Sequence, residues 1–163
     1  MLIQQSVDGS SVFHRSWAEF KVSFGHPSGN YWLGNELLSQ LTANNSYKLK
    51  FDLQSLSNTS NWYYAEYSTF RVLTEADNYT LQVAGYSGNA GRDSFIYHDG
   101  MMFSTYDRDN DRWSSTHCAA EYGGGFWYNA CYWCNVNSVR HFYWRRLPGG
   151  SALQSTRMWL QCK

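Results

Sequence analysis

The chain has 163 residues, which is enough for one domain with a hydrophobic core. Its 13 basic and 13 acidic residues cancel to zero net charge, so no bulk field favours nucleic acid or an anionic membrane. No apolar run approaches the length of a membrane span, which argues against membrane insertion. Aromatic residues make up 18% of the chain, and such side chains form both cores and contact surfaces for proteins and sugars.

Cysteine and asparagine patterns favour secretion. Four cysteines lie late in a loop-rich chain, which suits an oxidising compartment. The first residues show no leader, as in a processed product, a recombinant fragment or an incomplete gene model. Three glycosylation sequons agree with an extracellular glycoprotein: Asn44-Asn45-Ser46, Asn58-Thr59-Ser60 and Asn78-Tyr79-Thr80.

The first 42 residues predict a hairpin and two short helices. The turn signal Asp8-Gly9 indicates a hairpin within residues 1–16. A helix is expected from the N-cap Ser16 to the stop signal Gly25, with its apolar face formed by Trp17, Phe20 and Phe24. A second helix should lie within residues 30–42, with one apolar face formed by Leu37, Leu38 and Leu41.

The hydrophobic period then changes to two, which predicts strands. One strand is expected at residues 47–53, a second around Phe70 and Val72, and a third from Tyr79 to Val83. A short loop at residues 74–78 joins the last two as an antiparallel hairpin. Helices followed by strands predict an α+β fold with an antiparallel sheet. After Gly85 few clean strands are expected, so metal ions or disulfides should stabilise a largely irregular C-terminal part.

Residues 107–137 concentrate the chemistry of the chain. Asp107, Asp109 and Asp111 alternate, and oxygen-only ligands at that spacing suit Ca²⁺. An EF-hand is excluded, because its sixth position would be Arg112 and its twelfth Cys118. Two interpretations remain: a calcium loop of another type, completed by backbone carbonyls, or a solvated acidic turn.

The cysteines of this stretch favour a disulfide over catalysis. A bridge between Cys118 and Cys131 would close a short loop and stabilise the fold by roughly 3 kcal/mol in the chain-entropy model. The spacing from Cys131 to Cys134 could also indicate zinc or redox chemistry, but no second motif or βαβ context supports either. His117 beside Cys118 is a poor nucleophile–base pair, because adjacent side chains rarely meet. We therefore expect no enzymatic activity.

The chain resembles the fibrinogen C-terminal domain of fibrinogen-related proteins such as ficolins, tachylectins and angiopoietins. The match spans most of residues 3–137, and agreement weakens in the last thirty residues. It implies one domain, residues 1–163, without the family's N-terminal subdomain, with a helix and sheet part at about 1–85 and a calcium- and ligand-binding part at about 86–163. The matching pieces are "VDGSSVFHRSWAEFKVSFGHPSGNYWLGNELLSQLT", "YTLQVAGYSGNAGRDSFIYHDGMMFSTYDRDND" and "CAAEYGGGFWYNAC".

The resemblance implies a calcium ion as cofactor. Its side-chain ligands would be Asp109 and Asp111, and its backbone carbonyl ligands Trp113 and Ser115. Asp107 would be an outer-shell or solvent-facing member. The chain has one more residue than most relatives between the third aspartate and the following cysteine, which bears on the Ser115 assignment.

The resemblance also implies a pocket for acetyl groups, with amides around the second cysteine presented by a cis peptide. Position 132 is tyrosine where lectin-like members commonly have histidine, and position 134 is cysteine where serine is usual. The implied disulfide is Cys118–Cys131, while Cys134 and Cys162 are extra and could pair with each other or bridge to another chain. The residues assigned to the pocket are Tyr122, Ala130, Cys131 and Tyr132, with Tyr143 and Trp144 as candidates for a second wall.

Two functions follow from these expectations. The first is a secreted, calcium-dependent, lectin-like domain that binds acetylated glycans on microbial or cell surfaces, oligomeric in its full-length protein. The alternative is a fibrinogen-like protein-interaction module, a receptor ligand or adhesion domain without sugar binding. A third interpretation is a truncated module that folds poorly. Tyr122 and the acidic run favour the lectin, whereas Tyr132 and the shortened C-terminal segment favour the protein module.

Overall fold

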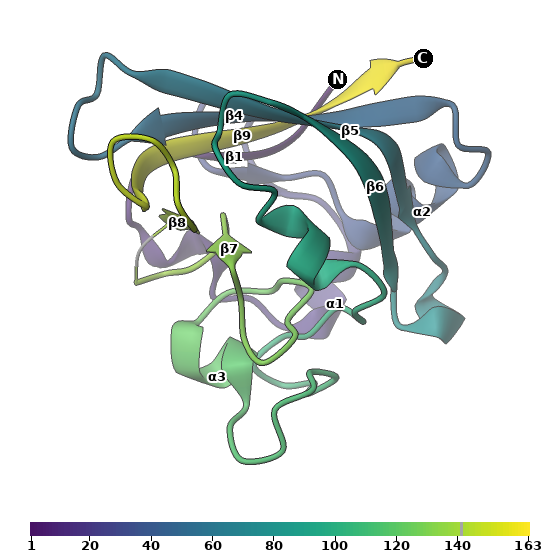
Figure 1. The fold of residues 1–163 in the computed structure, drawn as a ribbon. Coiled ribbons are helices and arrows are strands. Elements are labelled where there is room, and N and C mark those ends of the chain that lie inside the picture. Colours follow the sequence, from purple (N-terminus) through teal and green to yellow (C-terminus); the bar gives the residue numbers. More distant parts are fainter. Residues whose placement is uncertain (141) are drawn as a thin grey trace.

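A computed structural model describes residues 1–140 and 142–163. One antiparallel sheet dominates it, in the order β2-β3-β1-β9-β4-β5-β6, with β8 paired to β9 and β7 paired to β8 (Figure 1). The helical elements are η1 (Ser11–Phe13), α1 (Trp17–Lys21), α2 (Asn35–Thr42), η2 (Glu75–Asp77), η3 (Phe95–His98) and α3 (Cys118–Tyr122). The strands are β1 (Leu2–Ser6), β2 (Phe24–Gly25), β3 (Tyr31–Trp32), β4 (Tyr47–Ser55), β5 (Trp62–Val72), β6 (Leu81–Gly88), β7 (Cys134–Asn135), β8 (Phe142–Trp144) and β9 (Ala152–Cys162).

The predicted α+β class and antiparallel sheet are confirmed. Along β4 the side chains of Leu49, Phe51 and Leu53 are buried and their neighbours partly exposed, as the period of two predicts. The strand β5 pairs with β4 on one side and β6 on the other, and η2 forms the short connection from β5 to β6. Tyr79 lies before β6 in the left-handed region, with φ of 50°, so the third strand begins later than expected.

The largest difference from expectation is β9. The C-terminal part was expected to offer few strands, yet β9 lies in the middle of the sheet between β1 and β4. Its buried Thr156, Met158 and Leu160 alternate, but a register shift opposite Gln54 and Ser55 puts the buried Leu153 out of step with them. This irregularity interrupts the apolar period, which hides the strand from a periodicity argument.

The N-terminal expectations need three corrections. No hairpin forms at Asp8-Gly9, because β1 pairs with β3 and β9 instead. The helix α1 does begin after Ser16, whose side chain forms a capping box with Glu19, but it ends at Lys21 and Phe24 belongs to β2. In α2 the side chain of Leu38 is buried, whereas that of Leu37 is 42% exposed and faces away from the core.

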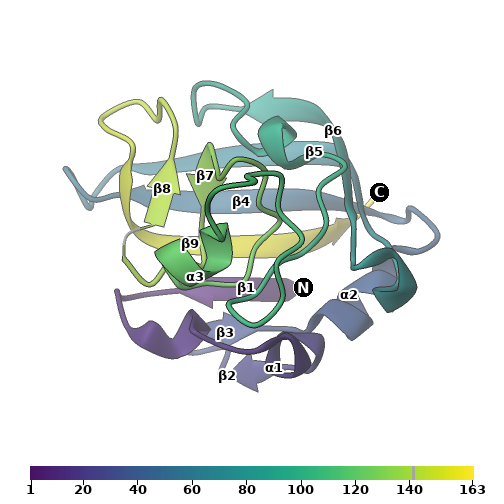
Figure 2. The same cartoon turned by 90° about the horizontal axis from the view of Figure 1, so that it is seen from below.

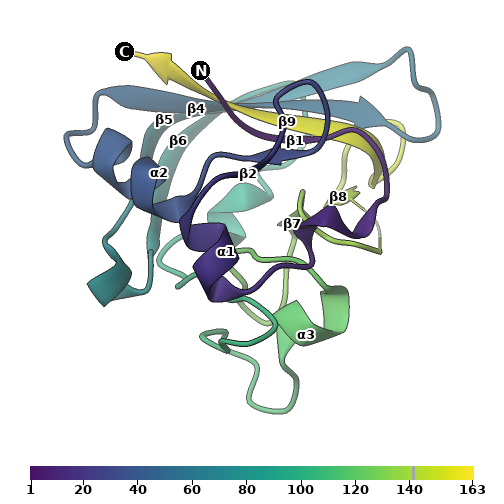
Figure 3. The ribbon, with the colours of Figure 1, turned by 180° about the vertical axis from the view of Figure 1, so that it is seen from behind.

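Residues 92–140 and 142–145 form a lobe on the buried face of the sheet, which contains η3, α3, β7, β8 and several loops (Figures 1 and 2). Large aromatic side chains join the two parts, among them Trp32, Phe103 and Trp127, whose rings contact one another. Figure 3 shows α1 and α2 on the same side of the sheet as this lobe. No helix of the described residues is long and apolar enough to cross a membrane.

The termini meet away from the lobe. The N-terminal amine of Met1 donates to the carbonyl of Leu160 at 2.7 Å, and the amide of Leu160 donates back to Met1 at 2.8 Å. Both ends therefore lie at the sheet, while the lobe projects from its other side (Figure 1).

Candidate functional site

A buried histidine fixes the segment that carries the candidate ligand residues. The Nδ1–H of His98 donates to the carbonyl of Trp127 at 2.7 Å, so Nε2 is free to accept from the amides of Trp133 and Cys134, each at 3.3 Å. His98 is fully buried, and this desolvation lowers its pKa to about 4. The ring is therefore neutral at physiological pH, as both hydrogen bonds at Nε2 require.

A buried glutamine ties the same segment to the sheet. Gln4 lies in β1, and its Nε2 donates to the carbonyl of Val136 at 2.9 Å and to Oδ1 of Asn137 at 3.1 Å. Asn137 in turn donates to the carbonyl of Gly125 at 2.9 Å. Two buried polar side chains thus hold β7 and its flanks, because their hydrogen bonds are fully made only in this arrangement.

Asp107 anchors α1. Its Oδ1 accepts from the amide of Trp17 at 2.9 Å and from the hydroxyl of Thr105 at 2.7 Å. The amide of Trp17 belongs to the first helical residue and has no partner within the helix. Asp107 was expected to be an outer-shell or solvent-facing member of a calcium site, and these bonds give it a structural role that the sequence does not reveal.

Asp109 and Asp111 lie together, as the calcium expectation requires. Asp111 accepts from the amides of Trp113 at 2.8 Å and Cys118 at 2.7 Å, while Asp109 accepts from the amide of Asp111 at 3.1 Å. Burial raises the pKa of Asp111, and the carboxylate of Asp109 adds to this rise. No ion pair among the described residues joins either aspartate to a basic side chain. Such a donor set fits a hard cation.

The other two expected calcium ligands lie on the exposed turn that follows. Trp113 and Ser115 are both exposed, and the carbonyl of Trp113 accepts from the amide of Thr116 at 3.2 Å. Within the described ranges no cluster of three His, Cys, Asp or Glu side chains could hold a metal. A calcium ion here would therefore depend on the two aspartates, backbone carbonyls and water. The calcium site stays a prediction.

The disulfide between Cys118 and Cys131 is confirmed, with their Cα atoms 5.5 Å apart. It links the start of α3 to the candidate ligand segment. Cys134 and Cys162 are both free, so the first of the two alternatives, that they pair with each other, is wrong. Cys134 is buried in β7 beside β8, which pairs with the first residues of β9, whereas Cys162 is exposed at the last residue of that eleven-residue strand. At about 3.3 Å per residue, the strand keeps the two thiols far apart.

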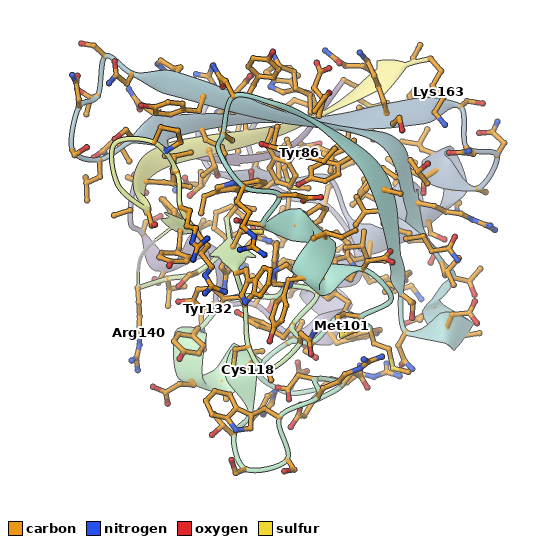
Figure 4. The ribbon with its side chains drawn as sticks, viewed as in Figure 1. Tyr86, Met101, Cys118, Tyr132, Arg140 and Lys163 are labelled. Atoms are coloured by element: carbon orange, nitrogen blue, oxygen red, sulfur yellow. A yellow bond between two sulfur atoms is a disulfide. The ribbon has the colours of Figure 1, made fainter. Side chains whose placement is uncertain are left out.

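Three of the expected pocket residues form one cluster, which we call the tyrosine cluster: Tyr122, Tyr132 and Tyr143. The ring of Tyr132 meets that of Tyr122 edge-on at 4.9 Å and that of Tyr143 at 5.8 Å between centroids. Burial and the two neighbouring phenols raise the pKa of Tyr132 to about 12. Tyr132 thus packs against both expected walls, and no pocket is found among the described residues. Figure 4 shows Tyr132 and Cys118 on the lobe, away from the sheet.

The remaining pocket residues divide into two kinds. The peptide between Ala130 and Cys131 is cis, the geometry that the resemblance implies; Ala130 is exposed and Cys131 buried. Trp144 is fully buried, packs against Phe51 at 5.2 Å and belongs to the core. Its assignment as a wall is therefore corrected, because a ligand would have to displace the core to reach it.

Sequence reasoning missed a second surface beside the tyrosine cluster. The indole of Trp133 stacks on Tyr97 at 4.5 Å and 6° between planes, and the guanidinium groups of Arg92 and Arg145 lie 5.4 and 4.6 Å from its centroid. The pairing of β7 with β8 places residues 133 and 145 side by side. These residues come from three distant segments, so only the unusual Trp133 inside the Cys131–Cys134 spacing could have drawn attention to it.

Comparisons with known proteins agree with this fold. The chain matches the family described as fibrinogen beta and gamma chains, C-terminal globular domain, over residues 1–156. Protein scabrous of Drosophila melanogaster is 44% identical over 135 residues, covering 83% of this chain and 16% of that protein. Angiopoietin-4 of Bos taurus is 40% identical over 169 residues, covering 96% and 33%. The chain thus spans a sixth to a third of the length of these relatives.

Solved structures give the same result. The fibrinogen-like globe domain of human ANGPTL2 superposes with a TM-score of 0.89 at 37% identity, covering 99% of this chain and 79% of that one. A lamprey fibrin D-dimer, complexed with the peptide ligand Gly-His-Arg-Pro-amide, superposes with a TM-score of 0.86 at 30% identity, covering 98% and 60%. On the family match, the sequence identities and the shared fold, this chain belongs to the fibrinogen C-terminal domain family.

Proposed function

We propose that this chain is an extracellular protein-interaction module, which binds a protein partner through its lobe and has no pocket for acetylated sugar. The observation that carries the proposal is the contact of Tyr132 with both Tyr122 and Tyr143. A small acetyl group needs a concave site, whereas partly exposed tyrosines on a closed surface suit a protein contact. The alternative function drawn from the sequence is thus better supported than the lectin.

The relatives support the same direction. The lamprey fibrin D-dimer, which shares this fold, is complexed with a peptide ligand. The rigid attachment of residues 133–137 through His98 and Gln4 presents the tyrosine cluster with little freedom, which lowers the entropic cost of binding. Calcium at Asp109 and Asp111 would stabilise the adjoining turn. Secretion, and oligomerisation in a longer protein, form part of the proposal.

A cell-surface binding assay tests this function against the lectin. The labelled chain, displayed on tetravalent streptavidin to gain avidity, is applied with calcium to untreated cells, protease-treated cells and cells with millimolar N-acetylglucosamine. We expect protease treatment to remove binding and the sugar to leave it unchanged. Binding that survives protease and is abolished by the sugar would contradict the proposal.

Matched variants locate the surface. Tyr143→Ala removes a partly exposed member of the tyrosine cluster, and we expect it to weaken binding at least tenfold. Trp62→Ala removes a side chain that is 40% exposed on the outer face of the sheet, opposite the lobe. This control should bind like the unmodified chain. Equal losses in the two variants would place the contact elsewhere.

A further inference from the structure

On the lobe, the guanidinium groups of Arg92 and Arg145 both lie over the indole ring of Trp133. We call these three residues the arginine–tryptophan site. The indole ring of Trp133 stacks on Tyr97 and also contacts the two guanidinium groups. Its carbonyl accepts from the amide of Arg145 at 2.9 Å. The backbones of Arg92 and Arg145 are bridged by the hydroxyl of Ser94, which lies 2.8 Å from the carbonyl of Arg145 and 3.4 Å from that of Arg92. The site is therefore built on fixed backbone.

The guanidinium groups of this site differ from the other arginines that lie over aromatic rings. Arg15 pairs with Glu19, Arg108 donates to Asn78 and Arg157 donates to Gln5. The guanidinium group of each of these three arginines therefore already donates to a polar neighbour. Across residues 1–140 and 142–163, the guanidinium groups of Arg92 and Arg145 have neither an ion pair nor a hydrogen bond to another residue.

The nearest carboxylate in sequence does not neutralise this site. Asp93 follows Arg92, but its Oδ1 accepts from the phenol of Tyr67 at 2.7 Å and from the amide of Ile96 at 3.1 Å. Two positive charges thus lie against one ring, each with planar N–H donors free for an external anion. An arginine fork is complementary to a carboxylate, which it binds through two parallel hydrogen bonds.

We propose that the arginine–tryptophan site binds an acidic segment of the protein partner, with paired Asp or Glu carboxylates on Arg92 and Arg145 and an apolar side chain against the neighbouring aromatic rings. This inference rests on the proposed function and specifies which kind of segment the protein partner presents. The segment is expected to continue from the site towards Tyr132 and Tyr143, since β7 and β8 place these residues alongside.

A short acidic peptide fits this surface better than a long polyanion. The chain has zero net charge, and the site contributes two cations rather than an extended basic stripe. A short peptide concentrates its charge on one or two side chains and so matches a site with two cations.

Nuclear magnetic resonance titration of the ¹⁵N-labelled, calcium-loaded chain tests the inference. The probe is Gly-Tyr-Glu-Glu-Gly-amide, with Gly-Tyr-Gln-Gln-Gly-amide as its uncharged match and the basic Gly-His-Arg-Pro-amide as an opposite-charge control. We expect the Glu peptide to shift the indole N–H signal of Trp133 and the side-chain N–H signal of Arg145 in a saturable manner. The Gln and basic peptides should leave both signals in place, and added salt should weaken the binding of the Glu peptide.

Variants and a competing polyanion complete the test. The double variant Arg92→Gln with Arg145→Gln should lower the affinity for the Glu peptide at least tenfold. The control Arg157→Gln changes the arginine that lies over Trp62 on the outer face of the sheet, and it should have no effect. Equal shifts from the Glu and Gln peptides would overturn the inference. So would shifts of these signals by a heparin octasaccharide but not by the Glu peptide, because that result identifies a polyanion site.

The two proposals fail in different ways. Protease-sensitive cell binding that the double arginine variant retains in full, together with no response to the Glu peptide, would overturn the acidic-partner inference and leave the proposed function intact. Cell binding that resists protease would overturn the proposed function itself. A protease-sensitive interaction that is weakened in the double arginine variant and unchanged in Arg157→Gln supports both.

Discussion

The ring of Tyr132 packs edge-to-face against that of Tyr122, with 4.9 Å between their centroids. The resemblance to acetyl-binding relatives places a pocket wall at Tyr122 and leaves room beside it. Here a tyrosine stands where lectin-like members commonly have histidine, and its ring contacts that expected wall. This contact is the basis of the proposed closed aromatic surface.

Packing at Tyr132 should be visible in stability. Tyr132→Ala removes ring contacts with Tyr122, Tyr143 and Tyr128, and we expect it to lower the free energy of unfolding by about 1–2 kcal/mol. Tyr132→Phe keeps the ring and is the matched control, with an expected change within about 0.5 kcal/mol. Chemical denaturation checks both values. If the two variants are equally stable, the ring does not pack as described.

Stability should fall on mild acidification because of His98. The pKa of His98 is about 4 in the folded chain, whereas in the unfolded chain it has the ordinary value of 6.5. The unfolded chain therefore binds the proton more tightly. The stability that neutral His98 contributes is complete above pH 6.5 and is lost as the pH falls towards 4. Between pH 7 and pH 5 this loss amounts to about 2 kcal/mol.

Denaturation at pH 7 and pH 5 measures this effect. His98→Gln has no titrating ring, so its loss between the two pH values should be smaller than that of the unmodified chain by about this amount. His26→Gln, at an exposed histidine, is the control and should keep the full dependence. An unchanged dependence in His98→Gln would show that another group is responsible.

Calcium should stabilise the chain through Asp109 and Asp111. At a calcium concentration about a hundredfold above the dissociation constant, the expected gain is about 2.7 kcal/mol. Asp109→Asn with Asp111→Asn should abolish this gain, which calorimetric melting with and without chelator measures. Asp107→Asn is the matched control, because an amide oxygen can still accept from Trp17 and Thr105. The assignment is wrong if calcium stabilises the double variant as much as the control.

The three sequons should differ in occupancy when the chain is secreted from eukaryotic cells. Asn44 and Asn58 are exposed in turns next to β4. Asn78 is partly buried, accepts from Arg108 at 2.9 Å and donates its amide nitrogen to the sulfur of Met102 at 3.5 Å. Mass spectrometry should find glycans at the first two sites and none at the third. Asn44→Gln and Asn58→Gln should each remove one glycan, and a fully occupied Asn78 would contradict the expectation.

The sequence predicts elements whose signal is local. The period of two in β4 and the cap at Ser16 each depend on neighbouring residues. The amino-acid sequence alone is enough to locate these two features, because short-range geometry determines them. The bridge between Cys118 and Cys131 follows from the family resemblance, and the structure confirms it.

Features that depend on tertiary contacts are not predictable in this way. The register shift in β9 puts Leu153 out of step with Met158 and Leu160 and so masks the alternation of the strand. The arginine–tryptophan site joins Arg92 to residues more than forty positions away, without any shared motif. The contacts of Tyr132 with Tyr122 and Tyr143 depend on the direction of its side chain, which a substitution in a family pattern does not specify.

The most direct test of a closed interaction surface is titration of the calcium-loaded, ¹⁵N-labelled chain with N-acetylglucosamine, observed at the amides of Cys131 and Tyr132. The packing of Tyr132 predicts no saturable shift of either amide at millimolar sugar. A saturable shift confined to these amides and to residues around Tyr122 would show an open acetyl pocket and contradict the account.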